Sequence, residues 1–132
     1  MRRPNPDTCE RFFRQVVAHR ERVRAAMGDR WAAGRAYHID RTSQPSVRGA
    51  NRQPLKGIGM RRIQDEELRT ITVPVTLIWG KNDRVMRFKI AEEASAKFGW
   101  PLYSIDDCGH ASVMERPDAV IEALRAAIDT RP

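Results

Sequence analysis

The sequence predicts an α/β fold in which parallel strands flanked by helices follow a helical N-terminal segment. Residues 71–132 show the order strand, helix, strand, helix, and short loops between such elements imply parallel strands joined by a right-handed crossover. Residues 1–70 instead show one long amphipathic helical pattern and then a stretch without any period. The charge balance also differs, at +8 for the first segment and −1 for the second. We therefore expect two segments that meet near residue 70.

The composition limits the expected number of domains and the cellular compartment. The 132 residues, 41% of them hydrophobic, are enough for one ordinary globular domain or part of one. Two cysteines, Cys9 and Cys108, cannot form a disulfide framework, and no apolar secretory segment follows MRRPNP, so we expect a cytoplasmic protein. The longest apolar stretch, residues 73–79, is far shorter than the roughly 20 residues of a membrane span. No membrane association is expected.

The N-terminal pattern predicts a helix over about residues 8–27. Asp7 and Glu10 resemble a capping box, and Gly28 suits the position just after the helix end. The apolar residues that share one face of the helical wheel are Cys9, Phe12, Val16, Val23 and Met27. His19 lies at the border of this face, where we expect it to pack.

The arginines of this helix do not form a binding stripe. A half this basic can bind nucleic acid by neutralising phosphates. However, Arg11, Arg14 and Arg22 share the polar face of the wheel with two glutamates, as on an ordinary solvated surface. Nucleic acid is therefore not the expected partner.

The pattern dissolves between Gly34 and Gly59, where prolines and glycines predict an irregular linker or lid segment. Residues 57–59, Gly-Ile-Gly, follow no strand and are read as a turn rather than a phosphate-binding loop. A short helix is expected over residues 65–68.

The second segment is more regular. The apolar run VTLIW, residues 75–79, is typical of a strand buried on both faces of a parallel sheet. A helix from Phe88 to Phe98, closed by Gly99, and a second strand at residues 102–105 follow. Pro117 then opens a helix whose apolar stripe consists of Val120, Ile121, Leu124 and Ile128.

Two ionisable residues follow the two strands. Asp83 lies in the turn after the first strand, and His110 lies in the turn after the second. Catalytic groups gather at the carboxyl ends of parallel strands. We therefore expect Asp83 and His110 to belong to one site.

These motifs resemble a known family. The pattern I-x-V-P-V-x-L-I-W-G-K-x-D, followed by D-x-C-G-H-A and E-x-P-x-x-V, is similar to the closing third of the α/β-hydrolase fold over roughly residues 70–129. The residues that carry the resemblance are Gly80, Asp83, Gly109, His110, Glu115 and Pro117. It implies that Asp83 is the acid and His110 the base of a catalytic triad. It also implies that residues 1–70 form a cap-like segment and residues 71–132 part of the hydrolase core.

Other interpretations of these residues remain open. Asp83 is also typical of a turn after glycine, and His110 of a structural histidine. Cys108 and His110 have the spacing of half a metal site, but His19 and His38 offer no matching ligand spacing, so neither a metal nor another cofactor is expected.

Three neighbouring residues are assigned structural roles. Asn82 and Arg84, which flank Asp83, are read as turn residues. Glu115 precedes Pro117, where a negative charge favours the N-terminus of a helix.

The chain lacks a nucleophile in the expected setting. The motif Gly-x-Ser-x-Gly is absent, and no serine, cysteine or aspartate upstream of Asp83 lies in a strand-turn-helix context. The resemblance therefore implies a truncated hydrolase for a small apolar substrate with an ester or related bond. We expect the isolated chain to be inactive.

The missing strands imply a partner. An unpaired apolar strand edge associates readily, so we expect self-association or a separately encoded N-terminal half. The alternative function is a non-catalytic binding or regulatory domain that uses the basic N-terminal half.

Overall fold

The computed structural model describes residues 5–47, 50 and 63–129, which belong to two compact units. One unit comprises the chain up to residue 11 together with residues 28–72, and the other comprises residues 12–27 and the chain from residue 73. The expected boundary near residue 70 stays a prediction.

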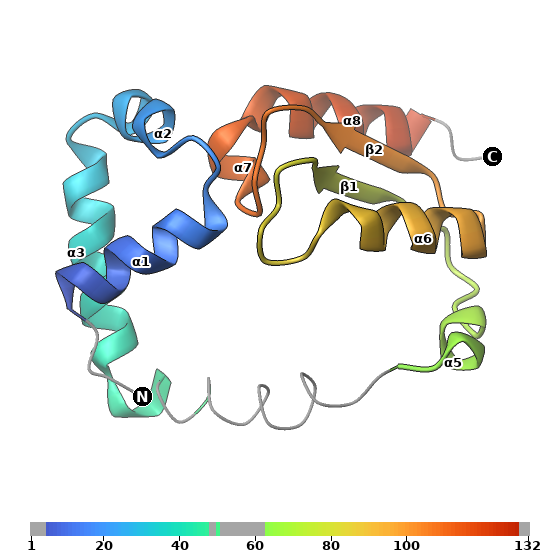
Figure 1. Cartoon of the computed structure of the whole chain (residues 1–132), viewed down its shortest axis with the longest axis horizontal. Helices are drawn as coiled ribbons and strands as arrows, with labels where there is room; N and C mark the ends of the chain where they lie inside the picture. Colours follow the sequence, from blue (N-terminus) through green and yellow to red (C-terminus); the bar gives the residue numbers. More distant parts are fainter. Residues whose placement is uncertain (1–4, 48–49, 51–62, 130–132) are drawn as a thin grey trace. The chain divides into compact units, whose positions relative to one another are not determined.

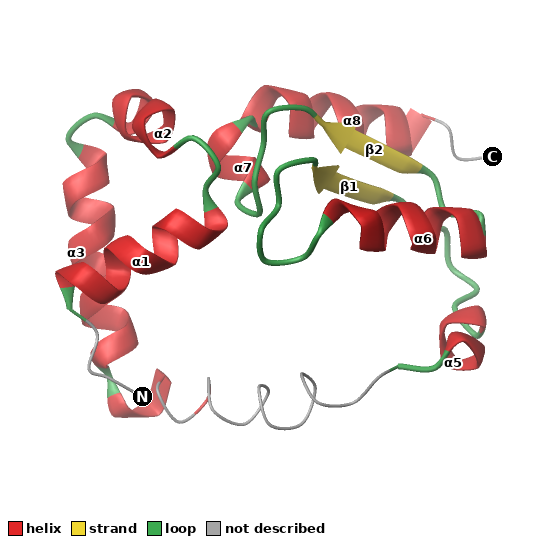
Figure 2. Cartoon of the chain, in the orientation of Figure 1, coloured by secondary structure: helices red, strands yellow, loops and turns green. Residues whose placement is uncertain are grey.

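The second unit contains a small parallel sheet. Strands β1 (Leu77–Gly80) and β2 (Leu102–Ile105) are parallel, with Leu77 opposite Leu102 and Gly80 opposite Ile105. Helix α6 (Phe88–Phe98) connects them, and α7 (Ser112–Glu115) and α8 (Pro117–Asp129) follow β2 (Figures 1 and 2). The expected α/β fold and its order of strand, helix, strand, helix are confirmed.

Two helices cover the strands. Helices α6 and α8 each contact both strands, which lie between them in Figure 1. Helix α6 ends where expected, since Gly99 adopts a left-handed conformation at φ 70° and its N–H bonds to the carbonyl of Ser95. The buried cluster between β2 and α8 consists of Ile105, Cys108 and Val120.

The sheet is less buried than the sequence suggests. The side chains of residues 77–79 are only half-buried, which corrects the expectation of a strand enclosed on both faces. On α8, Val120 and Ala123 face the core, whereas the rest of the expected stripe is exposed: Ile121, Leu124 and Ile128. The two strands described here are too narrow to cover that stripe.

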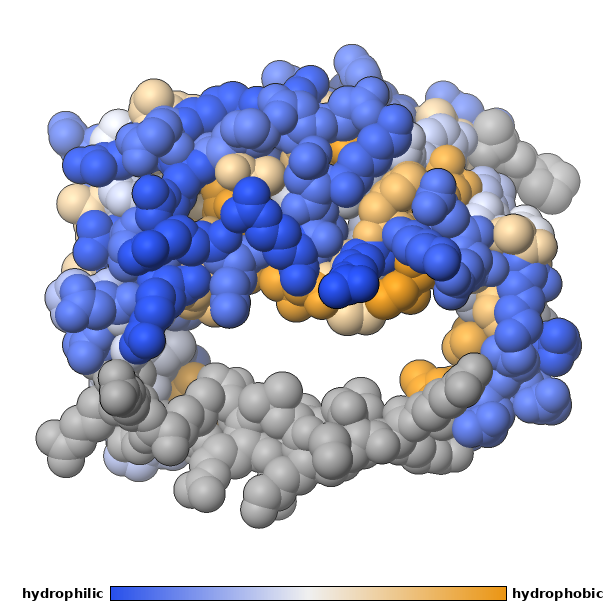
Figure 3. Space-filling model, viewed as in Figure 1, coloured by the Kyte–Doolittle hydropathy of each residue, from blue (hydrophilic) through white to orange (hydrophobic). Residues whose placement is uncertain are grey.

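Further apolar surface lies on α6 and the loop before it, as Figure 3 shows. The exposed side chains there belong to Val85, Met86 and Ile90. Burial of such surface contributes about 25 cal/mol per Å². A covering partner would therefore stabilise this unit.

Helix α1 (Pro6–Val16) begins differently from the prediction. The backbone N–H of Thr8 donates to the side chain of Asn5, and the Asn5 N–H donates to the Thr8 hydroxyl, both at 2.8 Å. The cap is therefore Asn5 with Thr8 rather than Asp7 with Glu10, because Asn5 lies immediately before the first helical residue.

The expected helix over residues 8–27 is in fact two helices. Helix α1 ends at Val16, and α2 (Arg20–Met27) begins after a bend of three residues. The inward face of α1 then follows Cys9, Phe13 and Val16, so Phe13 is 9% exposed and Phe12 is 45% exposed. The single-helix wheel chose Phe12 because it used apolar residues beyond the bend.

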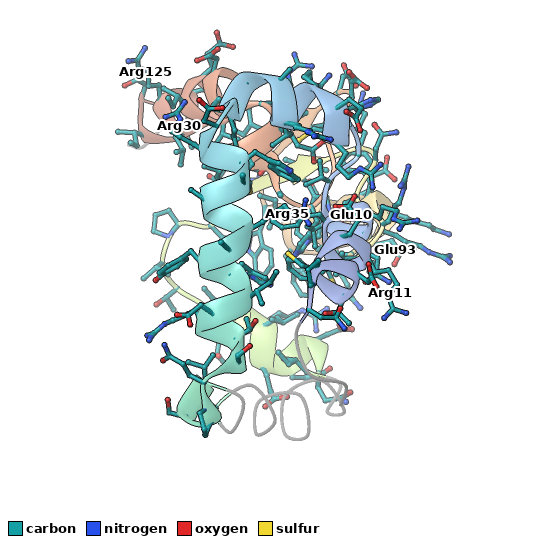
Figure 4. The ribbon with its side chains drawn as sticks, turned by 90° about the vertical axis from the view of Figure 1, so that its left-hand side faces the viewer. Glu10, Arg11, Arg30, Arg35, Glu93 and Arg125 are labelled. Atoms are coloured by element: carbon teal, nitrogen blue, oxygen red, sulfur yellow. The ribbon has the colours of Figure 1, made fainter. Side chains whose placement is uncertain are left out.

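The first unit also contains α3 (Arg30–Ser43), which corrects the expected irregular segment from Gly34 onward. One glycine costs a helix only about 1 kcal/mol, and its neighbours here favour helix. Arg35 extends from α3 toward α1, where Glu10 lies (Figure 4), and its side chain bonds to the buried Cys9. Burial is the largest cause of the raised pKa of this thiol, which the Arg35 charge partly offsets.

Helix α5 (Asp65–Arg69) confirms the short helix expected there and has a capping box formed by Gln64 and Glu67. The turn expected at residues 57–59 and the end of the irregular segment lie outside the described residues. At the end of α2, Gly28 adopts φ 54°, as expected for a residue that closes a helix.

Candidate functional site

Asp83 and His110 meet at the carboxyl ends of the two strands. Nδ1 of His110 lies 2.8 Å from Oδ2 of Asp83. The other Asp83 oxygen, Oδ1, accepts the backbone N–H groups of Val85 at 2.8 Å and Met86 at 2.9 Å. Asp83 thus stabilises its own turn and also contacts His110.

The pair combines a buried carboxylate with an accessible ring. Asp83 is 9% exposed, whereas the His110 side chain is 42% exposed. With its proton on Nδ1, the imidazole donates to Asp83 and leaves the Nε2 lone pair available to accept a proton. Within the described residues, Nε2 has no hydrogen-bond partner. This arrangement suits a general base.

Close backbone contacts bring the two turns together. The Asn82 N–H donates to the carbonyl of Cys108 at 2.8 Å. A Cβ atom at Gly80 would lie 2.5 Å from the same carbonyl oxygen and closer still to that of Gly109. Only glycine allows this approach, which explains why the strand before Asp83 ends in Gly80.

Glu115 holds the His110 loop from behind. This carboxylate is 5% exposed. Its Oε1 accepts the Gly109 N–H at 2.8 Å, and its Oε2 accepts the N–H groups of Ala18 at 2.9 Å and His19 at 3.1 Å. Its structural role therefore lies in joining the bend after α1 to the loop that carries His110, rather than in complementing the dipole of α8.

Sequence reasoning missed this connection. The only signal was the acidic residue two positions before Pro117, and its partners lie 96 and 97 residues away. Gly109 again needs to be glycine, because an added Cβ would lie 2.7 Å from both Ala18 N and Glu115 Oε1.

His19 is not a packing residue, which corrects the expectation for it. Its Nε2 pairs with Oδ1 of Asp107, and Arg22 reaches Oδ2 of the same carboxylate at 2.5 Å. The hydrogen bond from Arg22 is the largest cause of the lowered pKa of Asp107. Asp107 adopts φ 53°, a conformation that aspartate tolerates better than most residues. The bend thus turns His19 toward Asp107, in the turn that follows β2.

Cys108 lies inside the core and not at the surface of the site. Burial raises the pKa of its thiol to about 11, and the nearby Glu115 charge adds to the effect. Such a thiol remains protonated at neutral pH and is a poor nucleophile or metal ligand. Among the residues the structure describes, no group of three His, Cys, Asp or Glu side chains could hold a metal ion.

The flanking residues act through backbone and surface contacts. Asn82 contributes its N–H to the turn, as described, and a guanidinium N–H of Arg84 approaches the carbonyl of Arg14 at 3.4 Å. Lys81 pairs with Asp106 at 2.6 Å, which adds a surface contact between the two turns.

The parallel strands and the helices that flank them are those of an α/β-hydrolase type of fold. A model of the alpha/beta hydrolase family matches residues 2–123, and the chain belongs to this family. The resemblance inferred from the motifs is confirmed.

Individual relatives match shorter parts of the chain. It is 38% identical over 53 residues to the monoacylglycerol lipase abhd6-A of Xenopus laevis, covering 39% of this chain and 16% of that protein. It is 33% identical over 63 residues to the uncharacterized hydrolase YugF of Bacillus subtilis strain 168, covering 47% of this chain and 23% of the relative.

A solved structure extends the likeness in fold. The crystal structure of a membrane phospholipase A, described as a bacterial virulence factor, matches with a TM-score of 0.72 and 22% identity. The match covers 96% of this chain and 39% of that one. The chain therefore aligns with well under half the length of these proteins. None of the described helices is long and apolar enough to cross a bilayer.

Proposed function

We propose that this chain carries the acid and the histidine of a nucleophile-histidine-acid triad in a hydrolase. The observation that supports the proposal best is the 2.8 Å contact between His110 Nδ1 and the buried Asp83 carboxylate. Nε2 of His110 takes the proton of the nucleophile as that nucleophile attacks the substrate carbonyl. Asp83 keeps the imidazole in the correct tautomer and stabilises the imidazolium that forms.

The nucleophile comes from polypeptide outside these 132 residues. Gly-x-Ser-x-Gly is absent from the sequence, and the aligned part amounts to 16–23% of the curated relatives. The oxyanion hole belongs to the same missing part in this proposal. The 132-residue chain alone is then inactive.

The substrate is a small apolar compound with an ester or related bond. A monoacylglycerol lipase among the relatives supports an ester. Residues 1–70 are proposed to act as the cap-like segment of the complete enzyme.

We further propose that the polypeptide that supplies the nucleophile also completes the sheet. In the described residues β1 pairs with β2 only, which leaves the other edge of β1 open. Apolar side chains of α6 and α8 also remain exposed, among them Ile90, Ile121 and Leu124. An added strand and its helices would cover this surface, and without them the chain is expected to self-associate.

The first test is to sequence the DNA upstream of the Met1 codon. A reading frame that encodes strands and a Gly-x-Ser-x-Gly elbow would supply the partner. Light scattering of the chain alone should show self-association, and co-expression with the partner should give one defined complex. A monodisperse chain that melts cooperatively without a partner would count against the need for sheet completion.

The second test is turnover of a p-nitrophenyl ester by the completed protein. His110→Ala should abolish turnover, and Asp83→Asn should reduce kcat by about 10³ to 10⁴-fold, the scale for a triad acid. Asp106→Asn is the matched control, because Asp106 lies in the neighbouring turn and pairs with Lys81 at the surface. If Asp83→Asn costs less than about tenfold, Asp83 is not the acid.

A further inference from the structure

A cavity of about 400 Å³ lies beside the bend between α1 and α2. Its walls come from Arg14, residues 17–22 and Arg84, all within the second unit. Neither Asp83 nor His110 lines it. Its volume is within the roughly 300–1,000 Å³ of small-molecule sites.

The walls of this cavity are rich in arginine. Four arginines are among the described residues that line it: Arg14, Arg20, Arg22 and Arg84. Glu21 is the only acidic residue among the described residues that line the cavity, and Val17 and Ala18 are apolar. The cavity therefore combines a strongly positive rim with some apolar surface.

Two of these four arginines are already paired with carboxylates. Arg22 binds Asp107 at 2.5 Å, and Arg20 lies 3.8 Å from Glu21. Arg14 and Arg84 have no carboxylate partner within the described part of the chain. The one contact of the Arg84 guanidinium there is the 3.4 Å approach to the Arg14 carbonyl.

Arg14 and Arg84, which have no carboxylate partner among the described residues, favour the binding of an oxyanion in this cavity. Arginine presents planar N–H groups that match carboxylate and phosphate oxygens, and such charge-assisted bonds are stronger than neutral ones. The start of α2 also lies at the cavity, where the helix dipole adds to the positive potential but does not by itself define a site.

We propose that this cavity binds a small organic molecule through an oxyanion group, a carboxylate or a phosphate ester, held by Arg14 and Arg84. The site goes beyond the proposed hydrolase and does not depend on it. It is nevertheless connected to the pair Asp83 and His110. Arg84 follows Asp83 directly in the sequence. The Val16 carbonyl accepts the N–H of Ala111, the residue after His110, at 2.8 Å.

Isothermal titration calorimetry of the full chain with four probes tests the proposal. Benzoate and phenyl phosphate should bind at one site, at least about tenfold more tightly than neutral benzamide, and salt should weaken them. Inorganic phosphate should bind more weakly than phenyl phosphate because it lacks an apolar body. Benzamide binding as tightly as benzoate, inorganic phosphate binding as tightly as phenyl phosphate, or no saturable binding would each overturn the proposal.

Variants locate the site. Arg14→Gln and Arg84→Gln should each weaken benzoate binding by about tenfold, the scale of one charge-assisted hydrogen bond. Arg125→Gln, on the exposed surface of α8 (labelled in Figure 4), removes the same charge away from the cavity and should leave the affinity unchanged. Equal effects of all three substitutions would mean that only the net charge attracts the anion.

A measurement on the chain without substitutions tests the same site if the variants do not fold. Phenylglyoxal reacts with accessible arginines, and mass spectrometry identifies the sites. Benzoate should protect Arg14 and Arg84 but not Arg125, and a lack of such protection would contradict the site. The variant His110→Ala should keep full benzoate affinity, so a failed hydrolase assay and a failed anion site give different results.

Discussion

The turns after the two strands and the bend between α1 and α2 are held by different contacts. At the strand ends, main chain packs directly on main chain, and the absence of a side chain at Gly80 makes this possible. At the bend, one distant carboxylate, Glu115, accepts two backbone N–H groups. An added side chain should therefore disrupt the packing at the strand ends, whereas loss of the Glu115 carboxylate should disrupt the bend.

The loop that carries the exposed His110 is held by contacts of both kinds. The loop of His110 is held on one side by the β1 turn and on the other by Glu115. The bend and the loop that carries His110 therefore share one acceptor, Glu115.

The largest expected effect is that of Gly80→Ala. The new methyl group would overlap backbone carbonyls that cannot move separately, so we expect a loss of about 4 kcal/mol in the free energy of unfolding. Gly28→Ala is the control, because nothing lies within 4 Å of its Cβ position and only its φ of 54° is unfavourable. That cost is about 1 kcal/mol. Urea unfolding followed by circular dichroism measures both, and similar costs would refute the close approach.

Glu115→Ala should have the next largest effect. Three backbone N–H groups lose their acceptor, one of them buried and two partly buried, and we expect a cost of about 3 kcal/mol because unsatisfied donors away from water are expensive. Hydrogen exchange should accelerate at Ala18, His19 and Gly109 together. The same substitution at the exposed Glu122 of α8 should change neither quantity. Acceleration at Gly109 alone would show that the bend does not depend on this carboxylate.

A pair of adjacent phenylalanines tests the break in the N-terminal helix. Phe13→Ala should cost about 2 kcal/mol more than Phe12→Ala, because Phe13 is buried and Phe12 is half exposed. The reverse order in urea midpoints would favour one continuous helix with Phe12 inward.

The smallest effect concerns Asp107. Its pKa is lowered from 3.8 by the hydrogen bond from Arg22, so this contact stabilises the fold above about pH 3.8 and is lost as the pH falls through the lower folded value. Arg22→Gln should raise the midpoint of the Asp107 carboxyl signal in an NMR titration toward 3.8. The control Arg24→Gln, exposed on the same helix, should leave the midpoint where it is.

Local patterns were enough to predict the second segment. Alternation of apolar runs and helical spacing located both strands, α6 and α8, and turn chemistry placed Asp83 and His110 at neighbouring strand ends. These signals succeed because strand period, helix period and glycine conformations depend on residues close together in the chain. They failed for α3, where a single glycine was given too much weight.

The sequence by itself determined the α/β order, the family and the positions of the two candidate catalytic residues. Only the tertiary structure decided where the N-terminal helix breaks and that Glu115, rather than a helical carbonyl, accepts the N–H groups of Ala18 and His19. It also decided that arginines from two segments line one cavity. The physical reason is that a backbone N–H takes whichever acceptor the fold brings near. At this bend that acceptor comes from 97 residues away, where no local pattern can register it.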